Sequence, residues 1–104
     1  MALQGSIVFD NGITLSSGYL TVVQVCMDYG VGDNTAKICV MVHKDAAAFN
    51  AGNPEVIEYE HDVSDGDFNT YFSETILKQL NKTSLTQAYV WLKTLPQYSS
   101  LTDV

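Results

Sequence analysis

The sequence predicts a single α+β domain over residues 1–104, in which a small antiparallel sheet is covered by one or more C-terminal helices. Apolar and polar residues alternate in several runs of the first two-thirds of the chain, and a period of two is typical of strands. The apolar spacing then changes to three and four residues, which indicates helices. A chain of 104 residues is also long enough for one hydrophobic core.

The segment from about residue 18 to about residue 44 is predicted to form a hairpin. "GYLTVVQVCMDYG" and "AKICVMVHK" both alternate, and the "VGDNT" between them is rich in turn-forming residues. We expect the odd-numbered residues of the first strand to face the core, namely Tyr19, Val23, Val25, Met27 and Tyr29. The matching set in the second strand is Ala36, Ile38, Val40 and Val42.

The length of the hairpin loop determines which residues face each other. A two-residue loop at Gly32–Asp33 would place Cys26 opposite Cys39 and Asp28 opposite Lys37. A loop one residue later would place Asp28 opposite Cys39. We prefer the first register because it pairs opposite charges across the strands. We expect two free thiols in a reducing cytoplasm, and whether they are ever bridged stays open.

A further strand is predicted at about 55–63, after a short helical turn or loop in "DAAAFNAGNP". In "EVIEYEHDV" one face is apolar with His61 among its residues, whereas the other carries Glu58, Glu60 and Asp62. The acidic face is expected to be solvated and to discourage pairing of sheet edges. We expect His61 to be a hydrogen-bonded core residue and not a catalytic base.

The stretch "DGDFN" resembles the start of a calcium-binding loop but does not complete one. Asp65 and Asp67 fit the first positions, yet Thr70 stands where the loop needs glycine and Ile76 where it needs glutamate. We therefore predict no metal site, and interpret Asp67 as the cap of a helix that runs to "NKTS".

The last helix is predicted to start at Ser84, which has the spacing of a capping box with Gln87, and to end before Pro96. Its stripe of Leu85, Ala88, Tyr89 and Leu92 should lie on the sheet. Trp91 falls beside this stripe, and Tyr98 and Leu101 lie in the tail beyond the helix. The hypothesis is that Trp91, Tyr98 and Leu101 contact a neighbouring subunit.

Charge and composition argue against several classes of protein. Twelve acidic residues against five lysines and no arginine give a net charge of -7, which disfavours binding to nucleic acid. No apolar run is long enough to span a membrane, and no secretory signal opens the chain, so synthesis in a cytoplasm is expected. The sequence offers no nucleophile paired with a base, no metal cluster and no phosphate loop, and we predict no enzyme activity and no cofactor.

The ending "QAYVWLKTLPQYSSLTDV", with "SSGYLTVVQV" and "HKDAAAFNAGNPEVIEY", resembles a group of small tailed-bacteriophage proteins of similar length. The ending is the distinctive part, and its matching positions are Gln87, Ala88, Tyr89, Leu92, Lys93, Leu95, Pro96, Tyr98, Thr102 and Asp103. Gly18 replaces an alanine of the pattern, and "SETILKQLNKT" has no counterpart in it.

The resemblance implies a virion structural protein that acts through protein–protein interfaces, in the tail, fibre-attachment or baseplate region. A capsid cement or decoration protein is the alternative, as is a small acidic phage-encoded inhibitor of a host protein. It also implies other virion proteins as partners, a homo-oligomer, and a location in the virion after synthesis in the host bacterial cytoplasm.

Overall fold

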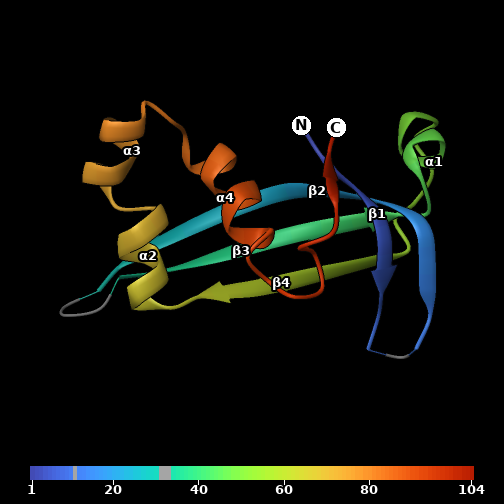
Figure 1. Ribbon diagram of the computed structural model, residues 1–104, viewed down its shortest axis with the longest axis horizontal. Coiled ribbons are helices and arrows are strands. Elements are labelled where there is room, and N and C mark those ends of the chain that lie inside the picture. The colour runs from blue at the N-terminus through green and yellow to red at the C-terminus, as the bar shows by residue number, and fades with distance from the viewer. Residues whose placement is uncertain (11, 31–33) are drawn as a thin grey trace.

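The computed structural model describes residues 1–10, 12–30 and 34–104. Within them lies a five-stranded antiparallel sheet in the order β4-β3-β2-β1-β5, with α2 packed against β3 and α4 against β2 (Figure 1). The strands are β1 (Leu3–Val8), β2 (Thr14–Tyr29), β3 (Asn34–His43), β4 (Ile57–Val63) and β5 (Thr102–Asp103). The helices are α1 (Ala46–Asn50), α2 (Asp65–Tyr71), α3 (Glu74–Leu80) and α4 (Ser84–Leu92). The predicted α+β class is confirmed, and so are the hairpin and the strand after it.

The predicted register of the hairpin is wrong. Tyr29 pairs with Asn34, and Cys26 lies opposite Lys37, while Cys39 lies opposite Gln24. The predicted loop falls on residues 31–33, outside the described part of the chain. The described pairing places Asp28 opposite Thr35, so the predicted Asp28–Lys37 charge pair is not formed.

A bulge between Val22 and Gln24 explains why the predicted core face of β2 is only half right. Because a bulge adds one residue to one strand, it moves the following side chains to the other face. Before the bulge, Leu20 and Val22 face the core, and after it Val25 and Met27 do. Val23 is 49 % exposed, contrary to the prediction. On β3 all four predicted residues are buried, namely Ala36, Ile38, Val40 and Val42.

Two strands that the sequence did not reveal, β1 and β5, bring the chain ends together. Leu3 of β1 pairs with Leu20 of β2 on one side and with Asp103 of β5 on the other. The backbones of Ala2 and Val104 exchange two hydrogen bonds of 3.1 and 2.9 Å. Both ends of the chain therefore meet at one edge of the sheet (Figure 1).

The β1–β2 hairpin bends away from the plane of the other strands. The pairing of β1 with β2 shifts between Gly5 and Ile7, and in Figure 1 β2 curves strongly in its first half. Because of this curl, Phe9 at the end of β1 comes within 6.1 Å of Tyr59 on β4, measured between ring centres. β1 and β4, which are separated by two strands in the sheet, thus approach each other on the core face.

The helices begin one to three residues away from the predicted caps. Ser64, not Asp67, caps α2. The predicted long helix is divided into α2 and α3 by Ser73, whose hydroxyl accepts a hydrogen bond from the Ile76 N–H. Thr83, not Ser84, caps α4. A short polar side chain before each helix satisfies an otherwise free backbone N–H, so several neighbouring Ser, Thr and Asp residues compete for the role.

The predicted stripe of α4 is confirmed for Ala88, Tyr89 and Leu92 and wrong for Leu85. The buried residues of α4 are Gln87, Ala88, Tyr89, Trp91 and Leu92. Leu85, which was predicted to be buried, is 47 % exposed. Gln87 and Trp91 are buried as well because α2 lies beside α4, and the Gln87 amide donates a hydrogen bond to the Tyr71 carbonyl at 3.0 Å.

Candidate functional site

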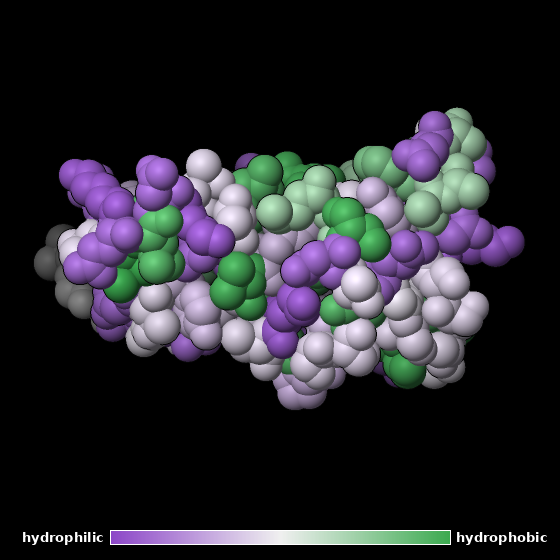
Figure 2. Space-filling model, turned by 45° about the horizontal axis from the view of Figure 1, so that its top comes forward, coloured by the Kyte–Doolittle hydropathy of each residue, from purple (hydrophilic) through white to green (hydrophobic). Residues whose placement is uncertain are grey.

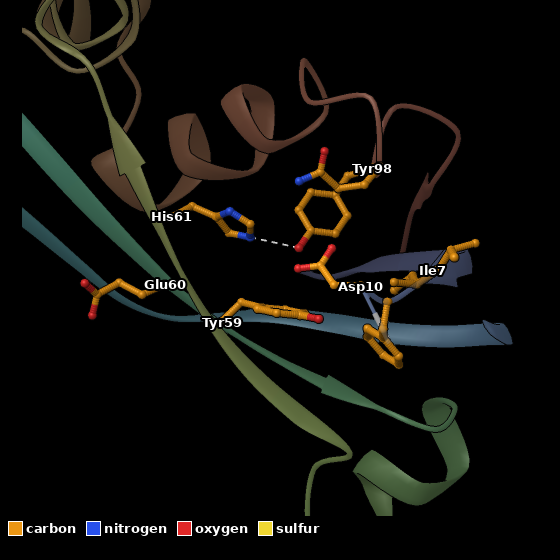
Figure 3. A pocket seen from close by; sticks show the side chains of 9 residues that line it. Ile7, Asp10, Tyr59, Glu60, His61 and Tyr98 are labelled. Atoms are coloured by element: carbon orange, nitrogen blue, oxygen red, sulfur yellow. Dashed lines mark hydrogen bonds between the residues drawn. The ribbon is translucent and has the colours of Figure 1, made fainter. Parts of the chain in front are cut away.

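The strongest candidate site is a cleft of about 400 Å³ on the core side of the sheet (Figure 3). Three segments enclose it: the end of β1, the middle of β4, and the chain after α4. The residues that line it are Ile7, Val8, Phe9, Asp10, Tyr59, Glu60, His61, Gln97 and Tyr98. The cleft exists because the curled hairpin approaches β4 without pairing with it.

His61 and Tyr98 form the hydrogen-bonded centre of the cleft. Nε2 of His61 lies 2.8 Å from the Tyr98 hydroxyl, and the two rings are perpendicular with centres 5.3 Å apart. Figure 3 shows the imidazole and the phenol pointing toward each other from β4 and from the C-terminal segment. The prediction of a hydrogen-bonded His61 is confirmed, although its side chain is only half-buried.

The protonation states of this pair follow from burial. Burial lowers the pKa of His61 below its ordinary value of 6.5, and the nearby charge of Asp62 opposes that change. Burial also raises the pKa of Tyr98 to about 12, with smaller contributions from Tyr59 and Asp10. At neutral pH the site therefore holds a neutral imidazole and a protonated phenol.

Asp10 supplies the negative charge of the cleft. It is exposed at the end of β1 and lines the cleft, and its charge acts on Tyr98. The described ion pairs of the chain join Lys37 to Glu60 and Lys93 to Asp103, and neither involves Asp10. Glu60 points away from the cleft, so Asp10 is the acid that faces it.

Aromatic rings form a continuous wall in the cleft. Tyr59 lies between Phe9 and His61, with ring centres 6.1 and 6.0 Å away, and Tyr98 follows His61. Phe9 and Tyr98 are buried, so the half-buried rings of Tyr59 and His61 are the ones with surface for a ligand. The cleft thus combines aromatic surface, one carboxylate and hydroxyl groups that donate and accept hydrogen bonds.

The three residues predicted to contact a neighbouring subunit lie instead in the core of their own chain. Trp91, Tyr98 and Leu101 are only 3 %, 2 % and 3 % exposed. The Trp91 indole N–H donates to Asp67 Oδ2 at 3.0 Å and so ties α4 to α2. Leu101 packs against Gly5, whose missing side chain leaves room for it. This burial corrects the interface hypothesis for these residues.

A spacing of three residues, which the sequence interpretation missed, explains the buried tail. Every third residue of the segment is apolar, namely Leu92, Leu95, Tyr98 and Leu101. The backbone N–H of each donates a hydrogen bond to the carbonyl of the one before it: Leu95 to Leu92, Tyr98 to Leu95, and Leu101 to Tyr98. Successive turns of this kind direct every third side chain to one side. The pattern continues past the end of α4 and past Pro96, where the spacing of an α-helix no longer applies.

The outer face of the sheet, opposite the helices, is largely uncovered. Its central row of half-buried residues is Cys26, Cys39 and Met41, and charged Lys37, Glu58, Glu60 and Asp62 surround the row. Of the described elements, α1 packs on this face at one end, where Phe49 lies 4.9 Å from Tyr19 and 5.2 Å from His43 between ring centres. The predicted solvation of the acidic side of β4 is confirmed.

The cysteines of the outer face are free thiols, as predicted, but they are diagonal neighbours and do not face each other. Burial raises the pKa of the Cys39 thiol, and the charge of Glu60 adds to that effect. Among the described residues, no three His, Cys, Asp or Glu side chains are grouped closely enough to hold a metal ion. No helix in the described ranges is long and apolar enough to cross a membrane.

Comparison with known proteins identifies no relative: no protein-family profile, no curated protein and no solved structure matches the chain significantly.

Proposed function

We propose that this chain is a structural protein of a tailed-bacteriophage virion, in the tail, fibre-attachment or baseplate region, and that it acts through protein–protein interfaces. The resemblance of its last eighteen residues, 87–104, to small phage proteins suggests the class. The observation that carries the interface function is the uncovered outer face of the sheet. On this proposal its partners are other virion proteins or further copies of the chain.

The outer face has the composition of a surface that packs against another protein. Met41 and the two cysteines form an apolar centre, and exposed charges on β3 and β4 surround it. An apolar centre with a polar rim is the usual arrangement of a protein interface, and methionine adapts its shape to a partner. The Lys37–Glu60 ion pair, 3.1 Å long and half-exposed, belongs to that rim.

The face with the helices and chain ends is arranged differently. Figure 2 shows hydrophobic and hydrophilic residues interspersed there, without one large continuous hydrophobic area. Val90 of α4, which is 42 % exposed, belongs to the helical layer. It therefore provides a matched control for a change on the outer face.

Two variants test the interface, each of which places a lysine at an apolar position. Met41→Lys introduces a charge into the centre of the outer face beside Glu58, and Val90→Lys introduces the same charge on α4. Both chains are expected to fold. In infected cells, Val90→Lys should enter particles as the original chain does, whereas Met41→Lys should remain in the soluble fraction. Equal entry of both variants into particles would contradict the proposed interface.

A further inference from the structure

We propose that the cleft of Asp10, Tyr59, His61 and Tyr98 binds the guanidinium group of an arginine side chain from a partner protein. The preference for this group rests on the cleft itself. The identification of its source as another virion protein rests on the proposed function.

The charge of the cleft selects a cation. Asp10 brings one carboxylate that no lysine of the described residues neutralises. Because burial keeps His61 neutral at pH 7, no positive charge in the cleft competes with an incoming cation. The chain itself has no arginine, so an arginine in the cleft must come from another molecule.

The aromatic wall favours a flat cation over a compact one. A guanidinium group stacks on aromatic faces and donates several hydrogen bonds in one plane, whereas an ammonium group is a strongly hydrated point charge. Tyr59 is half-buried and offers ring surface in the cleft, whereas Phe9 and Tyr98 line it as buried rings, and Asp10 stands at the same opening. The volume of about 400 Å³ lies within the roughly 300–1,000 Å³ that is usual for sites of small ligands.

The His61–Tyr98 bond prepares an acceptor for the guanidinium. If the Tyr98 hydroxyl donates to Nε2 of neutral His61, the phenol oxygen keeps its lone pairs for a donor in the cleft. Asp10 and Tyr98 both line the cleft, and the charge of Asp10 acts on Tyr98, so a planar group in the cleft can donate to both. Tyr98 thus has two functions, since it also fills the core beneath the cleft.

The test is a titration of the isotope-labelled full chain with N-acetylarginine amide, followed by amide chemical shifts in NMR spectra. We expect saturable shifts at residues 9, 10, 59 and 61. N-acetylcitrulline amide, which has the same shape without the charge, should cause none. Asp10→Asn should weaken binding about tenfold or more, because it removes a charge-assisted hydrogen bond. Glu58→Gln, the same change of charge on the outer side of β4, should leave binding unaltered.

Three results would overturn the proposal: shifts spread over the acidic surface instead of the cleft, equal binding of the citrulline probe, or unchanged binding by Asp10→Asn. Equal binding of N-acetyllysine amide would overturn the assignment to arginine. The titration uses the isolated chain, so its failure is distinct from failure of the virion proposal. A positive titration with a chain absent from particles would assign the arginine to a partner outside the virion.

Discussion

Gly5 lies opposite Gly18 in the β1–β2 pair, and neither position has free space for a Cβ atom. A Cβ on Gly5 would lie 3.0 Å from Leu101 Cδ2, and one on Gly18 would lie 2.9 Å from Ile7 Cδ1. Gly5 also has a backbone φ of +152°, a region that other residues rarely adopt. The two glycines therefore permit the close packing at the bend that forms one wall of the cleft.

Gly5→Ala should consequently lower the free energy of unfolding by about 1–3 kcal/mol, from backbone strain and the contact with Leu101. Urea unfolding measures this loss. Gly66→Ala is the control, because Gly66 lies in α2 with open space around it. That variant should be unchanged or gain up to about 1 kcal/mol from the better helix propensity of alanine. Equal losses at both positions would show that the bend has no special requirement for glycine.

The hydroxyl of Tyr89 links three segments of the chain. It accepts a hydrogen bond from the Val22 N–H at 2.9 Å and donates one to the Met1 carbonyl at 3.0 Å. Tyr89→Phe should therefore cost about 1–3 kcal/mol of unfolding free energy, because the partly buried Val22 N–H loses its acceptor. Tyr29→Phe, at a side chain that is 63 % exposed, should change stability little. Chemical unfolding of both variants compares them, and a neutral Tyr89→Phe would contradict the role given to this hydroxyl.

The structure places Leu101 in the core and Leu85 at the surface, whereas the sequence interpretation placed Leu101 at an interface and Leu85 in the core. Leu101→Ala should cost about 2–5 kcal/mol, as large-to-small changes in a core do. Leu85→Ala, at the position predicted from the helical stripe to be in the core, should stay within about 0.5 kcal/mol of the original chain. Thermal and urea unfolding decide between the two assignments. A stable Leu101→Ala chain with an unstable Leu85→Ala chain would restore the sequence-based interpretation.

The lowered pKa of His61 gives stability a defined dependence on pH. Its folded pKa lies below the ordinary 6.5, so the unfolded chain takes up a proton at higher pH than the folded chain. This histidine therefore contributes its full stability above about pH 6.5, and the contribution is lost as the pH falls through the folded pKa. The His61→Gln chain should therefore lose less unfolding free energy between pH 7 and pH 5 than the original chain does. Urea unfolding of both chains across that range measures the difference. Identical pH profiles for the two chains would show that His61 is not buried in its neutral form.

The sequence was sufficient for the fold class and for the interior of the sheet, because the alternation in β3 and β4 is regular and both strands have one buried face. It was insufficient for β2, since a bulge at Val23 leaves no local signal in a run of apolar residues. β1 escaped prediction for a related reason. "LQGSIV" contains a glycine with an unusual φ and a shift in pairing, which interrupt the alternation.

The candidate site could be predicted only in part. From its place on the apolar face of β4, His61 was predicted to be a hydrogen-bonded core residue and was assigned to no site, and its partner Tyr98 lies 37 residues away in sequence. Asp10 and Phe9 reach the cleft only through the curl of the β1–β2 hairpin, which is a property of packing. Trp91 and Asp67 were assigned separately to an interface and to a helix cap, whereas the structure joins them in one hydrogen bond.

Quantitative mass spectrometry of gradient-purified phage particles tests the proposed virion function most directly. Particles and the soluble lysate of the same infected culture would be compared for this chain and for the major capsid and tail proteins. The proposal predicts that the chain is retained in particles, in a fixed ratio to the other virion proteins across separate preparations. An abundant chain in the lysate that is absent from washed particles would contradict it, and would favour an acidic inhibitor of a host protein instead.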